Sequence, residues 1–339
     1  MLNGKKILIT SCGGLGDLIM FTPALRRLKE KYPACRLTFL TTEQHRAILE
    51  GLSYIDRVIC IQRGKFLGRY RILPELIQQD AVVFTDWQPQ LLLLSWIFGV
   101  KVRAGIPKAG HKLCKYFTKT LQNHVFRYTQ YAAQTDAMVF AEALDIELDG
   151  DMTRLDISQP QTADRRAVDA LLQDIGLAAD ADFLLVTPFA GLEQRNWPLA
   201  EVRKFVALAG KASGLPVIVA GPPDKRSEME GISAYNLTGR TTLLQLIELV
   251  CRSKLLVTPD SGPMHIAGAL GIPVVALFSK DLPSRWAPKH KCVPLTLHLS
   301  CSPCDDDTAR ACAAVQCMRG ITAEMVWENC KKLLHRWCE

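Results

Sequence analysis

The chain has 339 residues, 48% of them hydrophobic and 22% charged, which excludes a long disordered region and leaves enough chain for two domain cores. Its formal net charge of +7 is too small for a dedicated nucleic-acid-binding protein but suits a protein that holds small anionic substrates.

The N-terminal residues lead directly into the first predicted strand, without the apolar segment and small-residue cleavage site of a secretory signal. The longest apolar run, residues 91–100, is about half of the ~20 residues needed to span a bilayer. We therefore expect a cytoplasmic protein with, at most, peripheral membrane contact.

Short apolar runs alternate with amphipathic helical segments along the chain, as in parallel sheets covered by helices. The first series of predicted strands comprises residues 7–10, 37–40, 58–61 and 81–84, and the second comprises 183–187, 217–220, 255–258 and 274–278. The pattern weakens over residues 149–162, before a predicted helix at 163–175. We predict two Rossmann-like α/β domains, residues 1–155 and 156–339.

A glycine-rich loop, Ser11 to Asp17, follows the first predicted strand. Gly13, Gly14 and Gly16 allow a tight turn and close approach of a ligand to the backbone. Ser11 occupies the place of the first glycine in a dinucleotide-binding fingerprint, and the carboxylate of Asp17 would repel a pyrophosphate. A carboxylate kept ionised by the helix dipole suits a general base for a sugar hydroxyl, and a plain helix-capping acid is the alternative.

The segment from Lys101 to Thr135 contains seven basic residues and no acidic one, interleaved with aromatic side chains. An anion-binding surface and a solvated face balanced by acids from elsewhere in the fold explain this composition equally well. The basic residues are Lys101, Arg103, Lys108, Lys112, Lys115, Lys119 and Arg127.

Two loops that follow predicted strands of the second series carry groups suited to binding phosphate. Arg195 stands before a Trp-Pro helix entry, where its guanidinium can hold a phosphate with two donors or pack on Trp197 as an ordinary surface side chain. The strand at 255–258 leads through a Ser-Gly-Pro turn into a helix whose free amides can bind a diphosphate. The alternatives are a helix cap for Asp260 and a satisfied interior histidine for His265. The residues predicted for this site are Asp260, Ser261, Gly262 and His265.

These loops together resemble glycosyltransferase family 9, the bacterial lipopolysaccharide heptosyltransferases of GT-B architecture, over nearly the whole chain. The resemblance rests on residues 13–17 with 22–25, on 195–198, on 260–265, and on 279–283 with 285–288. It implies two Rossmann-like domains that face each other across a cleft, the N-terminal one for the acceptor and the C-terminal one for the nucleotide sugar.

The resemblance also implies residue roles. Asp17 would be the general base, Arg195 would contact the donor phosphate, and the loop 260–265 would hold the donor diphosphate and sugar. Asp224 matches an acidic position near the nucleotide ribose. Residues 279–281, Ser-Lys-Asp, depart from the Gly-Pro-Thr-Asp that is common in the family, so details of donor binding are expected to differ.

The activity implied is inverting transfer of heptose from ADP-heptose to the anionic lipopolysaccharide inner core, without a cofactor required for catalysis. Such an enzyme would work in the cytoplasm, in peripheral contact with the inner face of the inner membrane, and would bind no nucleic acid. One alternative is an NAD-dependent oxidoreductase, which Ser11 and Asp17 disfavour. The other is a non-catalytic sugar-nucleotide-binding protein of the same fold.

Twelve cysteines in a chain expected to be cytoplasmic favour free thiols or a metal site over disulfides. Four of them have the spacing C-x₂-C-x₇-C-x₄-C, short enough to surround one ion. Some members of the family that this chain resembles carry an iron-bound cysteine finger. A structural zinc or iron site and free thiols are both compatible with the spacing. The four residues are Cys301, Cys304, Cys312 and Cys317.

Overall fold

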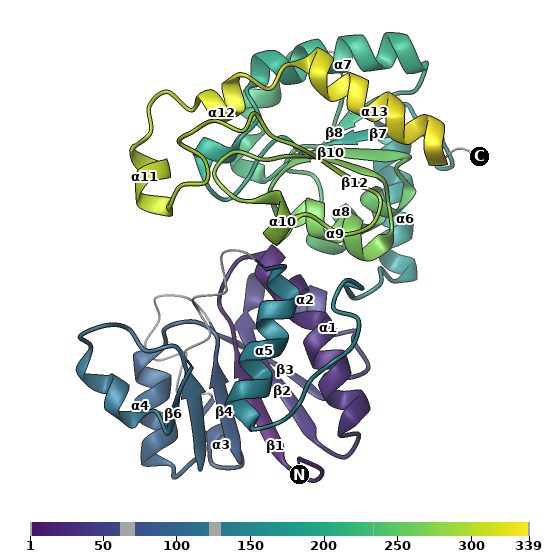
Figure 1. Cartoon of the computed structure of the whole chain (residues 1–339). Coiled ribbons are helices and arrows are strands. Elements are labelled where there is room, and N and C mark those ends of the chain that lie inside the picture. The colour runs from purple at the N-terminus through teal and green to yellow at the C-terminus, as the bar shows by residue number, and fades with distance from the viewer. Residues whose placement is uncertain (1, 62–71, 122–129, 233, 338–339) are drawn as a thin grey trace. The chain divides into compact units, whose positions relative to one another are not determined.

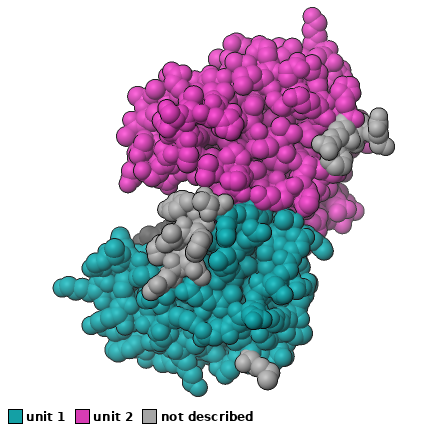
Figure 2. Space-filling view, viewed as in Figure 1, with its two compact units in different colours: residues 1–158 teal, residues 159–339 magenta. Residues whose placement is uncertain are grey.

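The computed structural model describes residues 2–61, 72–121, 130–232 and 234–337. The chain forms two compact units, residues 1–158 and 159–339 (Figure 2). The division falls three residues after the predicted boundary at 155, because this stretch is hydrogen-bonded to the first unit. The Asp156 amide donates to the Thr22 hydroxyl at 2.9 Å, and the Ser158 amide donates to the Ile48 carbonyl at 2.9 Å.

The first unit is built on a six-stranded parallel sheet of order β3-β2-β1-β4-β5-β6 (Figure 1). The four strands predicted in this unit are confirmed. The strands are β1 (Lys6–Thr10), β2 (Arg36–Thr42), β3 (Arg57–Ile61), β4 (Ala81–Phe84), β5 (Val102–Gly105) and β6 (Lys119–Thr120). The helices are α1 (Leu15–Lys31), η1 (Glu43–His45), α2 (Arg46–Leu49), α3 (Leu73–Leu76), α4 (Pro89–Ile97), η3 (Lys112–Tyr116) and α5 (Ala132–Leu144).

Helices cover both faces of this sheet because successive strand side chains point to opposite sides. On one face, Phe39 of β2 contacts Phe21 of α1, and Phe21 stacks on Phe140 of α5 with ring centroids 5.7 Å apart. On the other face, Leu40, the residue after Phe39, joins a core with Leu76 of α3 and residues of α4. The first unit is therefore a Rossmann-like domain with α1 and α5 on one side and α3 and α4 on the other.

The second unit repeats this plan, with the strand order β12-β11-β10-β7-β8-β9. The four strands predicted here are also confirmed. The strands are β7 (Leu184–Val186), β8 (Val217–Val219), β9 (Tyr235–Asn236), β10 (Leu255–Pro259), β11 (Val274–Leu277) and β12 (Cys292–Leu295). The helices are α6 (Thr162–Asp174), η5 (Glu193–Arg195), α7 (Leu199–Ser213), η6 (Pro223–Lys225), η7 (Ser227–Met229), α8 (Leu243–Arg252), α9 (Gly262–Leu270), α10 (Pro283–Trp286), α11 (Asp306–Ala311), α12 (Gln316–Arg319) and α13 (Ala323–Trp337).

The C-terminal helix α13 packs against α7, on one face of the second sheet. Phe205 of α7 makes edge-to-face contacts with Trp197 and with Trp327 of α13, at centroid distances of 5.6 and 6.3 Å. Trp197 is only 1% exposed, and its indole N–H donates to the Ile321 carbonyl at 3.0 Å. The indole thus anchors the loop that follows β7 to the helical layer, so its single polar atom is satisfied.

Both sheets change direction next to their first strand. In the first unit the chain adds β2 and β3 on one side of β1 and then crosses to β4 on the other, and in the second unit it crosses in the same way from β9 to β10, next to β7. Ligands of open α/β sheets bind at such switch points, beyond the carboxyl ends of the strands. The loops after β1 and β4, and those after β7 and β10, are therefore the positions at which to look for a site. Within the described segments, no helix has the length and apolar character to cross a membrane.

Candidate active site

The loop after β1 places Asp17 in the first turn of α1. Its carboxylate accepts a hydrogen bond from the Gly14 amide at 2.8 Å, so Asp17 caps the helix. A Cβ atom on Gly13 would lie 2.8 Å from the same carboxylate oxygen, which explains why this position needs glycine. Gly16 lies in the same first turn. A carboxylate can accept several hydrogen bonds, so this cap does not conflict with the predicted role of Asp17 as a base.

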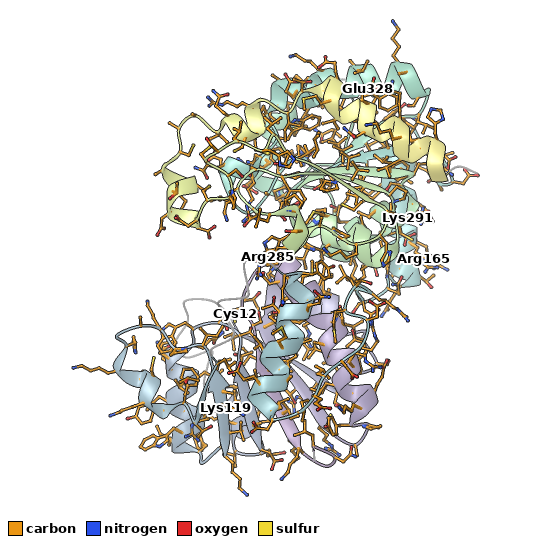
Figure 3. All side chains as sticks on the ribbon, viewed as in Figure 1. Cys12, Lys119, Arg165, Arg285, Lys291 and Glu328 are labelled. Carbon is orange, nitrogen blue, oxygen red and sulfur yellow. The ribbon has the colours of Figure 1, made fainter. Side chains whose placement is uncertain are left out.

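The loop after β4 supplies a second carboxylate, Asp86, which sequence reasoning did not single out. Its side chain accepts from the Cys12 amide at 3.0 Å, and so joins the loops after β1 and β4 across the switch point. Gln88 donates to the same carboxylate at 3.1 Å and to the Cys12 sulfur at 3.0 Å. Cys12 follows β1 and Asp86 follows β4, so the linkage lies at the carboxyl edge of this sheet, where Figure 3 labels Cys12. An acidic residue two positions after the predicted strand at 81–84 was the signal that could have revealed Asp86.

In the second unit, the loop after β7 directs Arg195 away from the hydrophobic core. The Asn196 side chain accepts from the Ala190 amide at 2.7 Å, and the Trp197 amide donates to the Pro188 carbonyl at 2.9 Å, so the loop is fixed on both sides of Arg195. Trp197 is buried, whereas Arg195 enters a set of ion pairs. The structure thus favours an ionic role for Arg195 over packing of its guanidinium on Trp197.

The ion pairs join the loops that follow β7, β10 and β11. Arg195 lies 2.8 Å from Asp281 and 3.4 Å from Asp260, between side-chain nitrogen and oxygen atoms. Lys280 lies 3.0 Å from Asp281 and 2.9 Å from Asp306. Lys280 and Asp281 belong to the segment that departs from the family pattern, and here they complete the charge arrangement around Arg195. We call Arg195, Asp260, Lys280 and Asp281 the ionic cluster.

The protonation state of Asp260 depends on its burial. Burial raises the pKa of the Asp260 carboxyl to about 7, Arg195 opposes this shift, and the neighbouring Asp281 adds to it. Charge-assisted N–H···O⁻ bonds are usually about 2.7–2.9 Å long, so the 3.4 Å separation from Arg195 fits a carboxyl that is only partly ionised. Asp281, at 2.8 Å, is the nearer of the two carboxylates to the guanidinium.

His265 lies on α9, next to the ionic cluster. Burial lowers the pKa of its imidazole to about 3, and the charge of Arg195 contributes to the shift, so the ring is neutral near pH 7. One ring edge faces Trp286 of α10, with centroids 6.2 Å apart. Within the described residues, neither His265 Nδ1 nor Arg195 Nε has a hydrogen-bond partner, although both atoms are buried. Buried polar atoms without partners are rare in folded proteins and commonly mark a site where a ligand or water binds.

The start of α9 contributes backbone amides. Ser261 is the N-cap residue, but its hydroxyl bonds to the Thr258 hydroxyl at 3.1 Å and to the Pro259 carbonyl at 3.2 Å instead of capping the helix. Gly262 is the first helical residue, where no side chain lies between the backbone and a ligand. The Ser261 side chain therefore accepts no hydrogen bond from the first amide groups of α9, which lie at the positive end of the helix dipole.

Asp224 lies on the exposed surface after β8, in η6. The neighbouring Lys225 lies 5.8 Å from the centre of the Phe189 ring in the loop after β7, so the two loops are adjacent. None of the ion pairs of the ionic cluster includes Asp224. The structure thus brings Arg195, Asp260, Ser261, Gly262 and His265 together at one sheet edge, leaves Asp224 on a neighbouring loop, and places Asp17 in the other unit.

The cysteine cluster is arranged differently from the predicted metal site. The described residues contain no group of three or more His, Cys, Asp or Glu side chains placed to hold an ion. Burial raises the pKa of the Cys304 and Cys317 thiols, and the proximity of Cys301 adds to both shifts. The Cys304 amide is tied to the Lys280 carbonyl at 3.0 Å, whereas the exposed Cys312 lies beyond α11 and its sulfur accepts from the Val315 amide at 3.4 Å. As placed, Cys312 does not complete a ligand set with the other three.

Thiol labelling with metal analysis tests this arrangement. In protein purified without an affinity tag, we expect at most one zinc or iron per chain, and the exposed Cys301 and Cys312 should react with a thiol reagent in the native state. Cys251, which is exposed on α8, is the matched control and should react in every sample. One equivalent of metal, together with protection of Cys301 and Cys312 but not of Cys251, would show that Cys312 joins the other thiols and that the arrangement described above is wrong.

Glycosyltransferases are among the solved structures that share this fold. The chain superposes with a TM-score of 0.84 on the family 9 glycosyltransferase of Veillonella parvula, at 22% identity and covering 99% of both chains. With ADP-heptose lipopolysaccharide heptosyltransferase II of Escherichia coli the TM-score is 0.75, at 20% identity over 98% of this chain and 99% of that one. The predicted GT-B class, with two Rossmann-like domains, is confirmed.

The sequence matches the same group of proteins. Lipopolysaccharide core heptosyltransferase OpsX of Haemophilus influenzae is 25% identical over 295 residues, covering 84% of this chain and 82% of that protein. Lipooligosaccharide heptosyltransferase 2 of the same organism is 26% identical over 308 residues, covering 84% and 86%. The family model described as glycosyltransferase family 9 (heptosyltransferase) matches residues 88–314, more than half of the chain. The chain therefore belongs to glycosyltransferase family 9, and it is an enzyme that transfers a sugar.

Proposed function

We propose that this enzyme transfers heptose from ADP-heptose to the lipopolysaccharide inner core, with inversion at the anomeric carbon. The observation that carries the proposal is the ionic cluster and the adjacent His265 at the start of α9, where Arg195 Nε and His265 Nδ1 are buried without hydrogen-bond partners among the described residues. Diphosphate oxygens would supply the missing partner of the guanidinium. Donor and acceptor are proposed by analogy with the relatives, whose names specify ADP-heptose and the lipopolysaccharide core.

The chemistry requires one base and one set of charges that stabilises the leaving group. Asp17 would accept the proton of an acceptor hydroxyl as its oxygen attacks the anomeric carbon, and a single displacement of this kind inverts that centre. Arg195, Lys280 and the amides at the start of α9 would stabilise the charge that develops on the departing diphosphate. Two fixed cations and a helix dipole make a divalent metal or another cofactor unnecessary in this proposal.

The proposed binding sites for acceptor and donor follow from the same two roles. The first unit would bind the acceptor through the loops after β1 and β4, and the second unit would bind the nucleotide sugar, with Asp224 near the ribose. With a lipid-linked acceptor, the transfer would take place at the cytoplasmic face of the inner membrane, and the contact of this enzyme with the membrane would be peripheral. We propose no nucleic-acid partner.

The raised pKa of Asp260 predicts that donor affinity depends on pH. Protonation as the pH falls through about 7 removes a negative charge beside Arg195, so a diphosphate should bind more tightly below that pH. Between about pH 8 and about pH 6 we expect up to about a tenfold gain in affinity. The folded pKa is above the ordinary value, so the free energy of unfolding should fall as the pH rises from about 4 to about 7.

Calorimetric titration with an ADP-sugar measures this dependence, because its diphosphate diester does not itself titrate in that range. Asp260→Asn carries no charge at any pH and should bind the donor equally well throughout, at about the level of the wild type at low pH. A wild-type affinity that is flat from about pH 6 to about pH 8 would show that the Asp260 carboxyl does not share the donor site.

The proposed reaction is tested with purified enzyme, ADP-heptose and lipopolysaccharide from a strain that lacks core heptose. Mass spectrometry should show addition of one heptose, and NMR of the new anomeric centre should show the configuration opposite to that of the donor. Donor binding without product would support the non-catalytic alternative, and nicotinamide-linked absorbance changes would support the oxidoreductase. Mass spectrometry of core oligosaccharide from a deletion strain would identify the linkage in the cell.

A further inference from the structure

One surface of the first unit exposes large apolar side chains. Among the described residues, Ile77 is 60% exposed, Trp96 is 48% exposed and Ile97 is 57% exposed, and no other large hydrophobic side chain reaches this level. Ile77 caps α3, and Trp96 and Ile97 are near or at the end of α4, which packs against α3. Large apolar side chains that cluster on one exposed surface mark an interaction site, whereas single scattered ones do not.

These apolar side chains lie away from the candidate active site. The Val102 amide at the start of β5 donates to the carbonyl of Asp80 at 3.1 Å, so the amino ends of β4 and β5 are side by side. Ile77 precedes β4, and Ile97 precedes β5, by only a few residues. Both therefore lie toward the amino edge of the sheet, whereas Asp17 and Asp86 follow the carboxyl ends of their strands.

Aromatic and basic side chains continue the surface from Trp96. The Trp96 and Tyr116 rings are 4.6 Å apart between centroids, and the Lys115 ammonium lies 5.2 Å from the centre of the Tyr116 ring. Lys112 precedes Lys115 by one helical turn of η3, which packs against α4. We call Ile77, Trp96, Ile97, Lys112, Lys115 and Tyr116 the α4 surface.

The lysines of this surface have no acidic counterpart. In the described part of the chain, Lys112 and Lys115 form no ion pair, and the sequence contains no acidic residue from position 87 to position 135. Lys119, in contrast, pairs with Asp145 of α5, and the Arg103 guanidinium is turned inward to donate to the Tyr116 carbonyl at 2.7 Å. Of the basic segment, Arg103 and Lys119 are therefore held within the fold, and Lys112 and Lys115 remain available to an external anion. Arg127 lies outside the described residues.

We propose that the α4 surface docks the enzyme on an anionic lipid bilayer. Tryptophan and tyrosine favour the boundary between headgroups and acyl chains, isoleucine favours the apolar side of that boundary, and lysines reach the phosphates. Protein interfaces are, in contrast, depleted in lysine, which disfavours a protein partner of similar size. Its apolar part lies toward the amino edge of the sheet, whereas its basic part begins next to His111, whose ring contacts Trp87 in the loop after β4, so a bound bilayer would lie beside that loop. This inference rests on the peripheral membrane contact of the proposed function and specifies its surface, but it does not require the proposed reaction.

Sedimentation with vesicles tests the proposal without donor or acceptor, so its outcome is separate from that of the transfer assay. The wild type should bind vesicles of phosphatidylglycerol and phosphatidylcholine and should not bind vesicles of phosphatidylcholine alone. Lys112→Glu with Lys115→Glu should reduce partitioning more than about tenfold, since each basic residue near such a surface contributes substantially. Trp96→Ser with Ile97→Ser should abolish the binding that remains at high salt, where charge attraction is screened.

The matched control makes the same change of charge on the other unit. Arg203→Glu with Lys211→Glu alters two exposed residues of α7 and should leave vesicle binding unchanged. Circular dichroism of every variant checks folding, and sedimentation velocity checks association. The proposal would be overturned if the α7 control lost as much binding as the lysine variant, or if the wild type bound both kinds of vesicle equally. A change of oligomeric state in the Trp96 and Ile97 variant would also overturn it, because the surface would then bind a second copy of the chain.

Discussion

Replacing Asp17 with asparagine is expected to slow sugar transfer about 10²- to 10⁴-fold while leaving the affinity for the donor nearly unchanged. Asparagine keeps a side-chain oxygen that can accept from the Gly14 amide, so the start of α1 should be preserved. What is lost is the capacity to take up a proton. Single-turnover rates with saturating donor and acceptor measure the effect directly.

A matched control separates the proposed base from the helix cap. Asp164 has the same position in α6 as Asp17 has in α1, and its carboxylate accepts from the Gln161 amide at 3.0 Å. Asp164→Asn should therefore leave the rate of transfer unchanged. If Asp17→Asn retains wild-type turnover, or if the two variants lose the same small fraction of it, Asp17 only caps its helix.

Arg195→Ala is expected to lower the donor affinity about 10- to 100-fold, and turnover at limiting donor by the same factor. Hydrogen bonds to charged groups contribute about 1.5–3 kcal/mol each, and the variant also leaves Asp281 with Lys280 as its remaining cation in the ionic cluster. Arg195→Lys should be milder, because a point charge still neutralises phosphate although it loses the two-pronged geometry. Calorimetric titration with an ADP-sugar measures both variants.

Arg252 is the matched control for Arg195, because it is also an arginine that bridges two carboxylates. On α8 it lies 2.6 Å from Asp169 and 2.6 Å from Glu248, and it precedes the amino end of β10 instead of following a carboxyl end. Arg252→Ala should lower the stability of the second unit without changing donor affinity. Unchanged affinity in Arg195→Ala, with thermal stability intact, would mean that the donor binds elsewhere.

The sequence predicted the central strands because their residues are consecutive and apolar. A strand buried on both faces needs an uninterrupted run such as residues 81–84, and the eight runs of this kind all became strands. The four strands that were not predicted are β5, β6, β9 and β12. β6 and β9 have two residues each, β5 contains Arg103, and β12 contains Pro294. Their extended conformation is imposed by hydrogen bonds to a neighbouring strand, which a local pattern does not contain.

The sequence by itself also determined the family and the loops of interest, since strand ends, glycines and helix starts are local features. The charge arrangement was decided by the tertiary structure alone. Asp281 and Arg195 are 86 positions apart in the sequence, yet their side chains are 2.8 Å apart because β7, β10 and β11 end at the same sheet edge. The same reason brings Asp86 to Cys12, because β1 and β4 also end at one sheet edge. The spacing of these residues along the chain predicts neither contact, because parallel strands are connected by long crossovers that bring residues distant in sequence to the same sheet edge.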